Sequence, residues 1–207
     1  MLVICHDNQV LVISDEIHHD LILSGHKFTS TLEIKDGFYR DVMVMVDAPS
    51  KTFNLAALNN CHVVIPNPQL RDLYDQKVAQ LSLPAGTLMG HVAGQAAYES
   101  GQEWLECMLE VIEDNYKYVK EELTTAFPQI KIADLQGTYL MWINLSGLMA
   151  KEDVEYFVKK KAGLAVDFGD WFGPSGLGHI RMNLATKPEN IQKAVKNLIT
   201  HLKEISK

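Results

Sequence analysis

The fold is decided by the apolar run Val42-Met-Val-Met-Val46 and by the turn that follows it, Asp47-Ala-Pro-Ser-Lys51. A short run that is apolar at every position is typical of a strand buried on both faces of a parallel sheet. The same pattern occurs earlier in Val10-Leu-Val-Ile13 and later in Cys61-His-Val-Val-Ile65. Glycines and polar turns separate the three runs. The first part of the chain therefore predicts an α/β sheet with its chemistry at the strand ends.

The second part of the chain predicts a long helix followed by a small α+β domain. Apolar residues recur at helical spacing from Trp104 to Leu123, and Pro128 ends the pattern. Candidates then follow in the order strand, helix, strand, strand, helix, at 138–143, 151–161, 164–166, 178–183 and 189–205. We therefore expect two domains, with a boundary between residues 98 and 99: the remainder of a large α/β domain in 1–98, then a bridging helix and a small domain in 99–207.

Composition excludes several classes of protein. The 207 residues include 19 basic and 26 acidic side chains, and the net charge of −7 argues against a nucleic-acid or membrane-surface binder. No apolar run is long enough for a membrane helix, and the N-terminus does not resemble a secretory signal. Cys5, Cys61 and Cys107 form no C-x-x-C pair, which favours reduced thiols and a cytoplasmic location. We predict no metal site, because the neighbours His18-His19-Asp20 point apart and lack a second ligand pair.

Three residues are candidates for chemistry. Asp15 follows the first apolar run, where open α/β sheets collect ligands, although Asp is also a favoured helix N-cap. Lys51 is either a solvated surface charge or a partly desolvated amine that can attack a carbonyl. Arg181 lies between Ile180 and Met182 in an apolar strand. It requires a planar anionic partner, which is either a structural carboxylate or the carboxylate of a substrate.

Three motifs, taken together, carry a family resemblance: Val12-Ile-Ser-Asp-Glu-Ile-His18, Ala48-Pro-Ser-Lys-Thr-Phe-Asn-Leu55 and His179-Ile-Arg-Met-Asn183. In this order they resemble the C-terminal half of fold-type I pyridoxal 5'-phosphate (PLP) enzymes of the class I/II aminotransferase superfamily. The resemblance is closest to the cystathionine β-lyase-like C–S lyases and covers essentially the whole chain. It implies an α/β fold in which the C-terminal part of the PLP-binding large domain precedes a small α+β domain.

The resemblance also implies roles for single residues. Lys51 would bind PLP covalently through a Schiff base and then move the proton of the substrate α-carbon. Asp15 would pair with the pyridinium nitrogen, Ser50 would help to hold the phosphate, and Arg181 would bind the substrate α-carboxylate. His18 stands where aminotransferases usually carry a tyrosine beside the phenolic oxygen of the cofactor, and this form resembles the lyase branch.

The sequence departs from the family pattern in two ways. Ala48 replaces a hydroxyl residue three positions before the lysine, and Asn59 replaces an arginine eight positions after it; the lyase branch tolerates both changes. Family members also carry most of the large domain before the strand that ends at Asp15. We therefore expect a truncated chain that is catalytically silent by itself.

The function implied by this resemblance is that of a PLP-dependent C–S β-lyase. Its substrate would be a sulfur-containing amino acid of the cystathionine or cysteine type, and the protein would be a homodimer without nucleic-acid or membrane partners. Two alternatives stay open: a PLP-dependent aminotransferase on the same scaffold, and a non-catalytic remnant that serves as a binding module.

Overall fold

A computed structural model describes residues 1–205. The chain divides into two compact units, which we call unit 1 (Met1–Glu106) and unit 2 (Cys107–Lys207). The division falls inside helix α5 (Gln102–Ala126). This helix confirms the long helix expected before Pro128. We retain the boundary between residues 98 and 99 as a prediction about the domains of the fold.

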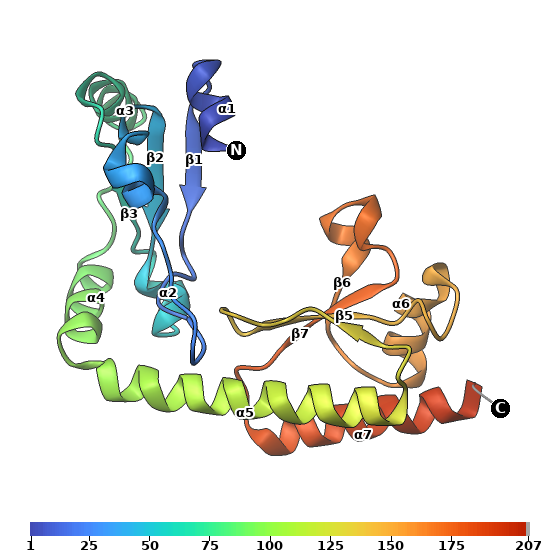
Figure 1. Ribbon diagram of the computed structural model, residues 1–207. Coiled ribbons are helices and arrows are strands. Elements are labelled where there is room, and N and C mark those ends of the chain that lie inside the picture. The colour runs from blue at the N-terminus through green and yellow to red at the C-terminus, as the bar shows by residue number, and fades with distance from the viewer. Residues whose placement is uncertain (206–207) are drawn as a thin grey trace. The chain divides into compact units, whose positions relative to one another are not determined.

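Unit 1 is built on a three-stranded sheet in the order β1-β2-β3 (Figure 1). Its helices and strands are α1 (Leu2–Asp7), β1 (Val12–Asp15), β2 (Met43–Asp47), α2 (Pro49–Thr52), β3 (His62–Val64), α3 (Pro68–Gln80) and α4 (Leu88–Ser100), with 3-10 segments at Thr31–Gly37, Arg40–Val42 and Ala56–Leu58. Strands β1 and β2 are parallel, as predicted. The parallel reading of the third run is wrong, because β3 is antiparallel to β2. Only short helical turns connect these two strands, whereas a parallel return needs a longer crossover.

The first strand differs from its prediction in position and in burial. It spans Val12–Asp15 rather than residues 10–13, and the side chain of Ile13 is 74% exposed. Among the described strands β1 pairs only with β2, so it forms an edge of the sheet. An apolar run therefore identified the strand correctly but overestimated how much of it is covered.

Unit 2 contains a four-stranded antiparallel sheet in the order β4-β5-β7-β6. Its elements after α5 are β4 (Lys131–Ile132), β5 (Leu140–Asn144), α6 (Val154–Tyr156), β6 (Asp167–Phe168), β7 (His179–Asn183) and α7 (Pro188–Ile205), with 3-10 turns at Lys151–Asp153, Gly169–Phe172 and Pro174–Gly176 and a π-helical turn at Phe157–Lys161. Strand β4 was not predicted, and β6 begins just beyond the expected range 164–166. The helix expected at 151–161 is instead a succession of 3-10, α and π turns.

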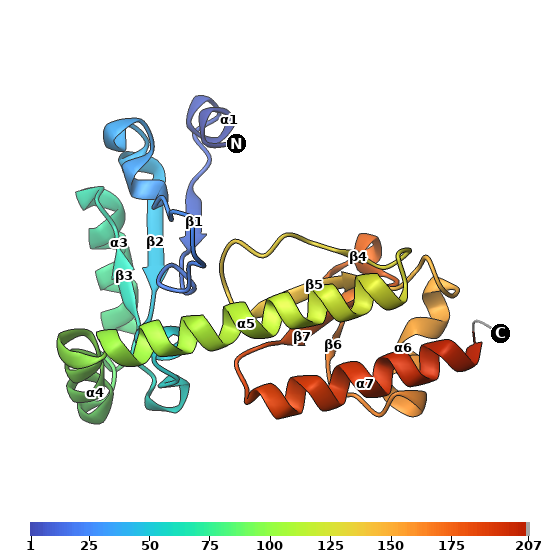
Figure 2. The ribbon, with the colours of Figure 1, turned by 60° about the horizontal axis from the view of Figure 1, so that its bottom comes forward.

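The core of unit 2 lies between its sheet and two helices. Helices α5 and α7 lie side by side against one face of the sheet (Figure 1 and Figure 2). Alternation along β7 buries Ile180 and Met182, whereas His179 and Arg181 are directed to the opposite face. The buried amide of Asn115 donates to the carbonyl oxygens of Leu184 (2.9 Å) and Thr186 (3.0 Å), which ties α5 to the segment before α7. None of the helices in the described chain is long and apolar enough to span a membrane.

Candidate active site

The candidate nucleophile Lys51 lies in helix α2, which is a single turn directly after β2. Ala48 is extended, and Pro49 begins the turn at a position where a missing N–H costs nothing. Pro49 and Thr52 are buried, and Lys51 is half-buried. The described residues give the Lys51 ammonium no ion-pair partner. The structure thus places Lys51 at a strand end as a half-buried residue rather than a fully exposed one.

Asp15 lies at the same edge of the sheet as this turn. Strands β1 and β2 are parallel and Asp15 is paired in register with Val46, so both strands end at one side of the sheet (Figure 1). The Asp15 Oδ1 atom accepts a hydrogen bond from the backbone N–H of Ile17 at 3.1 Å. The turn that follows does not become a helix, so Asp15 orients a turn rather than capping a helix. Its carboxylate is exposed at the strand end.

Glu16 fixes the backbone next to Asp15. Its buried carboxylate oxygen Oε1 accepts from the Thr31 N–H (2.9 Å), the Thr31 hydroxyl (2.6 Å) and the Ser14 hydroxyl (3.1 Å). Burial by itself raises the pKa of a carboxyl, but the hydrogen bonds from Thr31, Ser30 and Ser14 outweigh burial and lower the pKa of Glu16. The charged carboxylate therefore anchors the turn that carries Asp15 and His18.

A second carboxylate, Asp20, connects that turn to the Lys51 turn. Its Oδ2 atom accepts from the Thr52 hydroxyl at 2.9 Å and from the Tyr98 hydroxyl at 3.4 Å. Its Oδ1 atom lies 3.1 Å from His19 Nε2. The sequence drew attention to Asp20 only as a discounted metal ligand, and it gave no indication that Thr52 or Tyr98 would contact Asp20. Their separation from Asp20 by 32 and 78 positions leaves no local signal to find.

The two remaining predicted cofactor residues lie on these same turns. Ser50 is half-buried in α2, beside Lys51, and its carbonyl accepts from the Leu55 N–H at 3.0 Å. His18 is half-buried in the turn after Asp15, and its carbonyl accepts from the Leu21 N–H at 3.0 Å. The four predicted cofactor residues therefore come from two turns at one edge of the unit 1 sheet.

Arg181 lies in β7, an inner strand of the unit 2 sheet, with Trp142 opposite it on β5 and Asp167 opposite it on β6. Its Nε and Nη2 atoms both donate to Asp167 Oδ2, at 2.9 and 2.6 Å, and its guanidinium lies 4.4 Å from the centre of the Phe172 ring. The side chains of Arg181 and Asp167 are 31% and 38% exposed. Asp167 thus supplies the anionic partner of the structural alternative, and a role in binding substrate stays a prediction.

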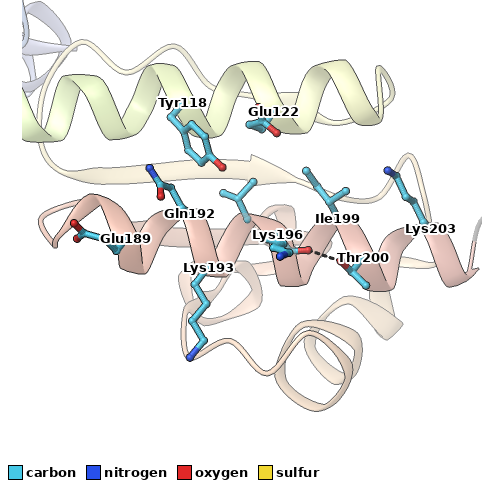
Figure 3. A pocket seen from close by; sticks show the side chains of 10 residues that line it. Tyr118, Glu122, Glu189, Gln192, Lys193, Lys196, Ile199, Thr200 and Lys203 are labelled. Carbon is cyan, nitrogen blue, oxygen red and sulfur yellow. Dashed lines mark hydrogen bonds between the residues drawn. The ribbon is translucent and has the colours of Figure 1, made fainter.

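A concave surface lies elsewhere, between α5 and α7 in unit 2 (Figure 3). It is an open groove of about 700 Å³. Its lining mixes lysines with glutamates: Tyr118, Glu122, Glu189, Gln192, Lys193, Val195, Lys196, Ile199, Thr200 and Lys203. Burial and the neighbouring Glu122 raise the pKa of Tyr118. The groove includes none of the predicted site residues, and we assign it no catalytic role.

The two-turn arrangement after β1 and β2, followed in the chain by a small α+β unit, agrees with the C-terminal part of the fold-type I PLP-enzyme fold. The family model for aminotransferases of class I and II matches residues 1–198, and the chain belongs to this family.

The chain is also similar to individual proteins within this family. The chain is 31% identical over 196 residues to cystathionine beta-lyase PatB of Bacillus subtilis, a match that covers 94% of this chain and 50% of PatB. It is 27% identical to protein MalY of Escherichia coli, covering 98% of this chain and 51% of MalY. The crystal structure of cystalysin from Treponema denticola, which contains PLP, superposes with a TM-score of 0.91 at 34% identity over 98% of this chain and 52% of cystalysin. The chain thus spans about half the length of the curated relatives it matches.

Proposed function

We propose that this chain carries the catalytic lysine and one part of the cofactor site of a PLP-dependent C–S β-lyase. The observation that carries the proposal is the half-buried Lys51, which lies at the same sheet edge as Asp15 and has no ion-pair partner within residues 1–205. The names of PatB and of the PLP-bound C–S lyase from Staphylococcus hominis support this reaction class. The substrate would be an amino acid of the cystathionine or cysteine type.

The donor set on the two turns fits the chemistry of PLP. A carboxylate (Asp15) suits a protonated ring nitrogen, an amine (Lys51) suits an aldehyde, and a hydroxyl (Ser50) suits a phosphate oxygen. The imidazole of His18 suits the phenolic oxygen. When bound, PLP supplies an electron sink for the charge that develops at the substrate α-carbon.

Each residue would then have a distinct task. Lys51 would hold the aldehyde carbon and later take the proton from the substrate α-carbon. Asp15 would hold a proton on the ring nitrogen, and Arg181 would orient the substrate through its α-carboxylate. Loss of the β-thiol and hydrolysis would leave pyruvate and ammonia. The homodimer expected from the family resemblance is part of the same proposal.

The first test asks whether Lys51 is the reactive amine. A lysine amine condenses with the PLP aldehyde with loss of water, and borohydride then delivers hydride to give a stable secondary amine. Peptide mapping after reduction compares Lys51 with Lys77, an exposed lysine on α3 of the same unit. We expect labelling of Lys51 to exceed that of Lys77 by about tenfold or more, since Asp15 and Ser50 would hold bound PLP close to Lys51 and nothing would hold it close to Lys77. Equal labelling of the two lysines would contradict the proposed function.

The second test separates a lyase from an aminotransferase by its product. A lyase releases pyruvate from cystathionine, whereas an aminotransferase converts an added keto acid into an amino acid. We expect no pyruvate from this chain alone, and pyruvate release after addition of a polypeptide that carries the first half of the PatB fold. The matched control is Lys51→Ala, which should abolish release. Keto-acid conversion without pyruvate would favour the aminotransferase alternative.

A further inference from the structure

Asp20 lies at the centre of a hydrogen-bond network behind the Lys51 turn. The network joins the turn after β1, through His19, to α2, through Thr52, and to α4, through Tyr98. Thr52 has no exposed surface, so its hydroxyl depends on Asp20 for a partner. The second nitrogen of His19, Nδ1, lies 2.8 Å from the Glu16 carbonyl oxygen. Asp20 is therefore connected to the backbone beside Asp15 on one side and to the neighbour of Lys51 on the other.

Helix α2 needs such an external connection. It comprises only Pro49–Thr52, and a single helical turn has no independent stability. Its apolar contacts hold the start and the end of the turn. Pro49 packs close to Gly94 of α4, where an added Cβ atom would lie 3.5 Å from Pro49 Cγ. The Phe53 ring packs edge-on against the Tyr98 ring, with 5.2 Å between the ring centres. The Asp20–Thr52 hydrogen bond is the polar contact that links this turn to the Asp15 turn.

We propose that Asp20 is a positioning residue that fixes the Lys51 turn relative to the Asp15 turn through its hydrogen bond with Thr52. Lys51 has a long flexible side chain, so its encounter with an aldehyde depends on where its Cα is held. A loose turn spreads the amine over many positions and lowers the fraction in bonding reach. The inference rests on the proposed function, because it assigns Asp20 a task only if Lys51 is the reactive amine.

Asp20 is one of two carboxylates close to the Tyr98 hydroxyl. The pKa of Tyr98 is raised by burial and by the negative charges of Asp20 and Asp47, which places both carboxylates near its hydroxyl. Asp47 is paired with His62, whose Nδ1 lies 2.6 Å from Asp47 Oδ1. Of the two carboxylates near Tyr98, Asp20 is the one that receives the Thr52 hydroxyl.

The test uses the ratio of Lys51 to Lys77 labelling by PLP and borohydride, measured in the whole chain. Thr52→Val removes the hydroxyl at nearly constant volume, and Asp20→Ala removes the acceptor. We expect each variant to lower the ratio by about tenfold, the scale of one lost hydrogen bond, and we expect the double variant to lower it no further than either single variant. Thr52→Ser keeps the hydroxyl and should restore the wild-type ratio.

Controls separate this inference from the proposed function and from misfolding. Thr124→Val removes a hydroxyl that bonds within α5, and Asp72→Asn removes an exposed charge on α3; neither should change the ratio. A wild-type ratio near one overturns the proposed function and this inference with it. A high wild-type ratio that survives in Thr52→Val overturns only the role of Asp20. If Asp20→Ala does not fold, as judged by circular dichroism, the difference between Thr52→Val and Thr52→Ser decides the outcome.

Discussion

The two units of the chain cover their apolar residues to very different extents. Among the described residues, six buried apolar side chains belong to unit 1 and 21 belong to unit 2. Large exposed apolar side chains show the reverse distribution, with 17 in unit 1 and five in unit 2. The most exposed include Ile13 on β1 (74%) and Leu88 on α4 (79%).

The physical reason lies in the layers of each unit. In unit 2 the apolar face of the sheet is closed by α5 and α7, which contribute Ile112, Val119, Val195 and Leu198 to a continuous core (Figure 2). In unit 1 the edge strand β1 pairs on one side only among the described strands, and Ile13 stays exposed. A run of apolar residues can therefore form a strand even where no other layer of the described chain covers its side chains.

The largest effect on stability is expected in the core of unit 2. Leu198→Ala, in the core of unit 2, should lower the free energy of unfolding by about 2–5 kcal/mol, because it leaves a cavity. Leu88→Ala, on the exposed start of α4, should change it by no more than about 0.5 kcal/mol. Urea unfolding followed by circular dichroism measures both, and hydrogen exchange shows which unit is affected. Equal losses in the two variants would mean that the start of α4 is covered in solution.

The same contrast determines what the sequence could predict about the fold. Helix α7 and strand β7 were predicted within a residue or two, because one periodic face of each is buried. Strand β4 was missed because it spans only Lys131–Ile132 and has no pattern of its own. The orientation of β3 could not be predicted either. Strand direction follows from the length and path of the connection, not from the apolar residues within the strand.

The next prediction concerns Glu16, a buried and hydrogen-bonded carboxylate in unit 1, the unit with fewer buried side chains. Because its pKa is lowered by folding, the charged form adds stability above the ordinary pKa of 4.5, and this stability is lost as the pH falls through the lowered value. Glu16→Gln should therefore cost about 1–3 kcal/mol at neutral pH, the range for hydrogen bonds to a charged group. Urea unfolding at a series of pH values measures the effect.

The acid limb of that series provides the check on Glu16. The gap between wild type and Glu16→Gln should close only as the pH falls below 4.5 and through the lowered pKa of Glu16, since protonation removes the charge that the variant lacks. Glu33→Gln, an exposed carboxylate in the neighbouring 3-10 segment, is the matched control and should follow the wild type. A constant gap between wild type and Glu16→Gln at every pH would show that Glu16 stabilises the turn by packing rather than by charge.

The sequence indicated the candidate reactive residues of the site but not the residues that hold them in place by hydrogen bonds. Asp15 and Lys51 follow apolar runs, and their type and place made them candidates. Asp20, Thr52 and Asp167 act through partners that are far away in the sequence or on another strand. Register and turn geometry bring such partners together, and a single sequence contains neither. Arg181 shows this limit clearly, because its need for an anion was predictable and the identity of that anion was not.

The smallest effect on stability is expected at Arg181, on the less covered face of the unit 2 sheet. If its pair with Asp167 behaves as a partly exposed ion pair, Arg181→Gln should lower the free energy of unfolding by about 1 kcal/mol or less. Breaking a buried structural pair would cost about 3–5 kcal/mol. The control is Lys159→Gln, which breaks the exposed pair with Glu155 at 3.6 Å and should cost a similarly small amount. Urea unfolding of both variants decides between the two roles. A large loss in Arg181→Gln alone would make Arg181 structural, whereas a small one would leave its guanidinium available for the carboxylate of a substrate.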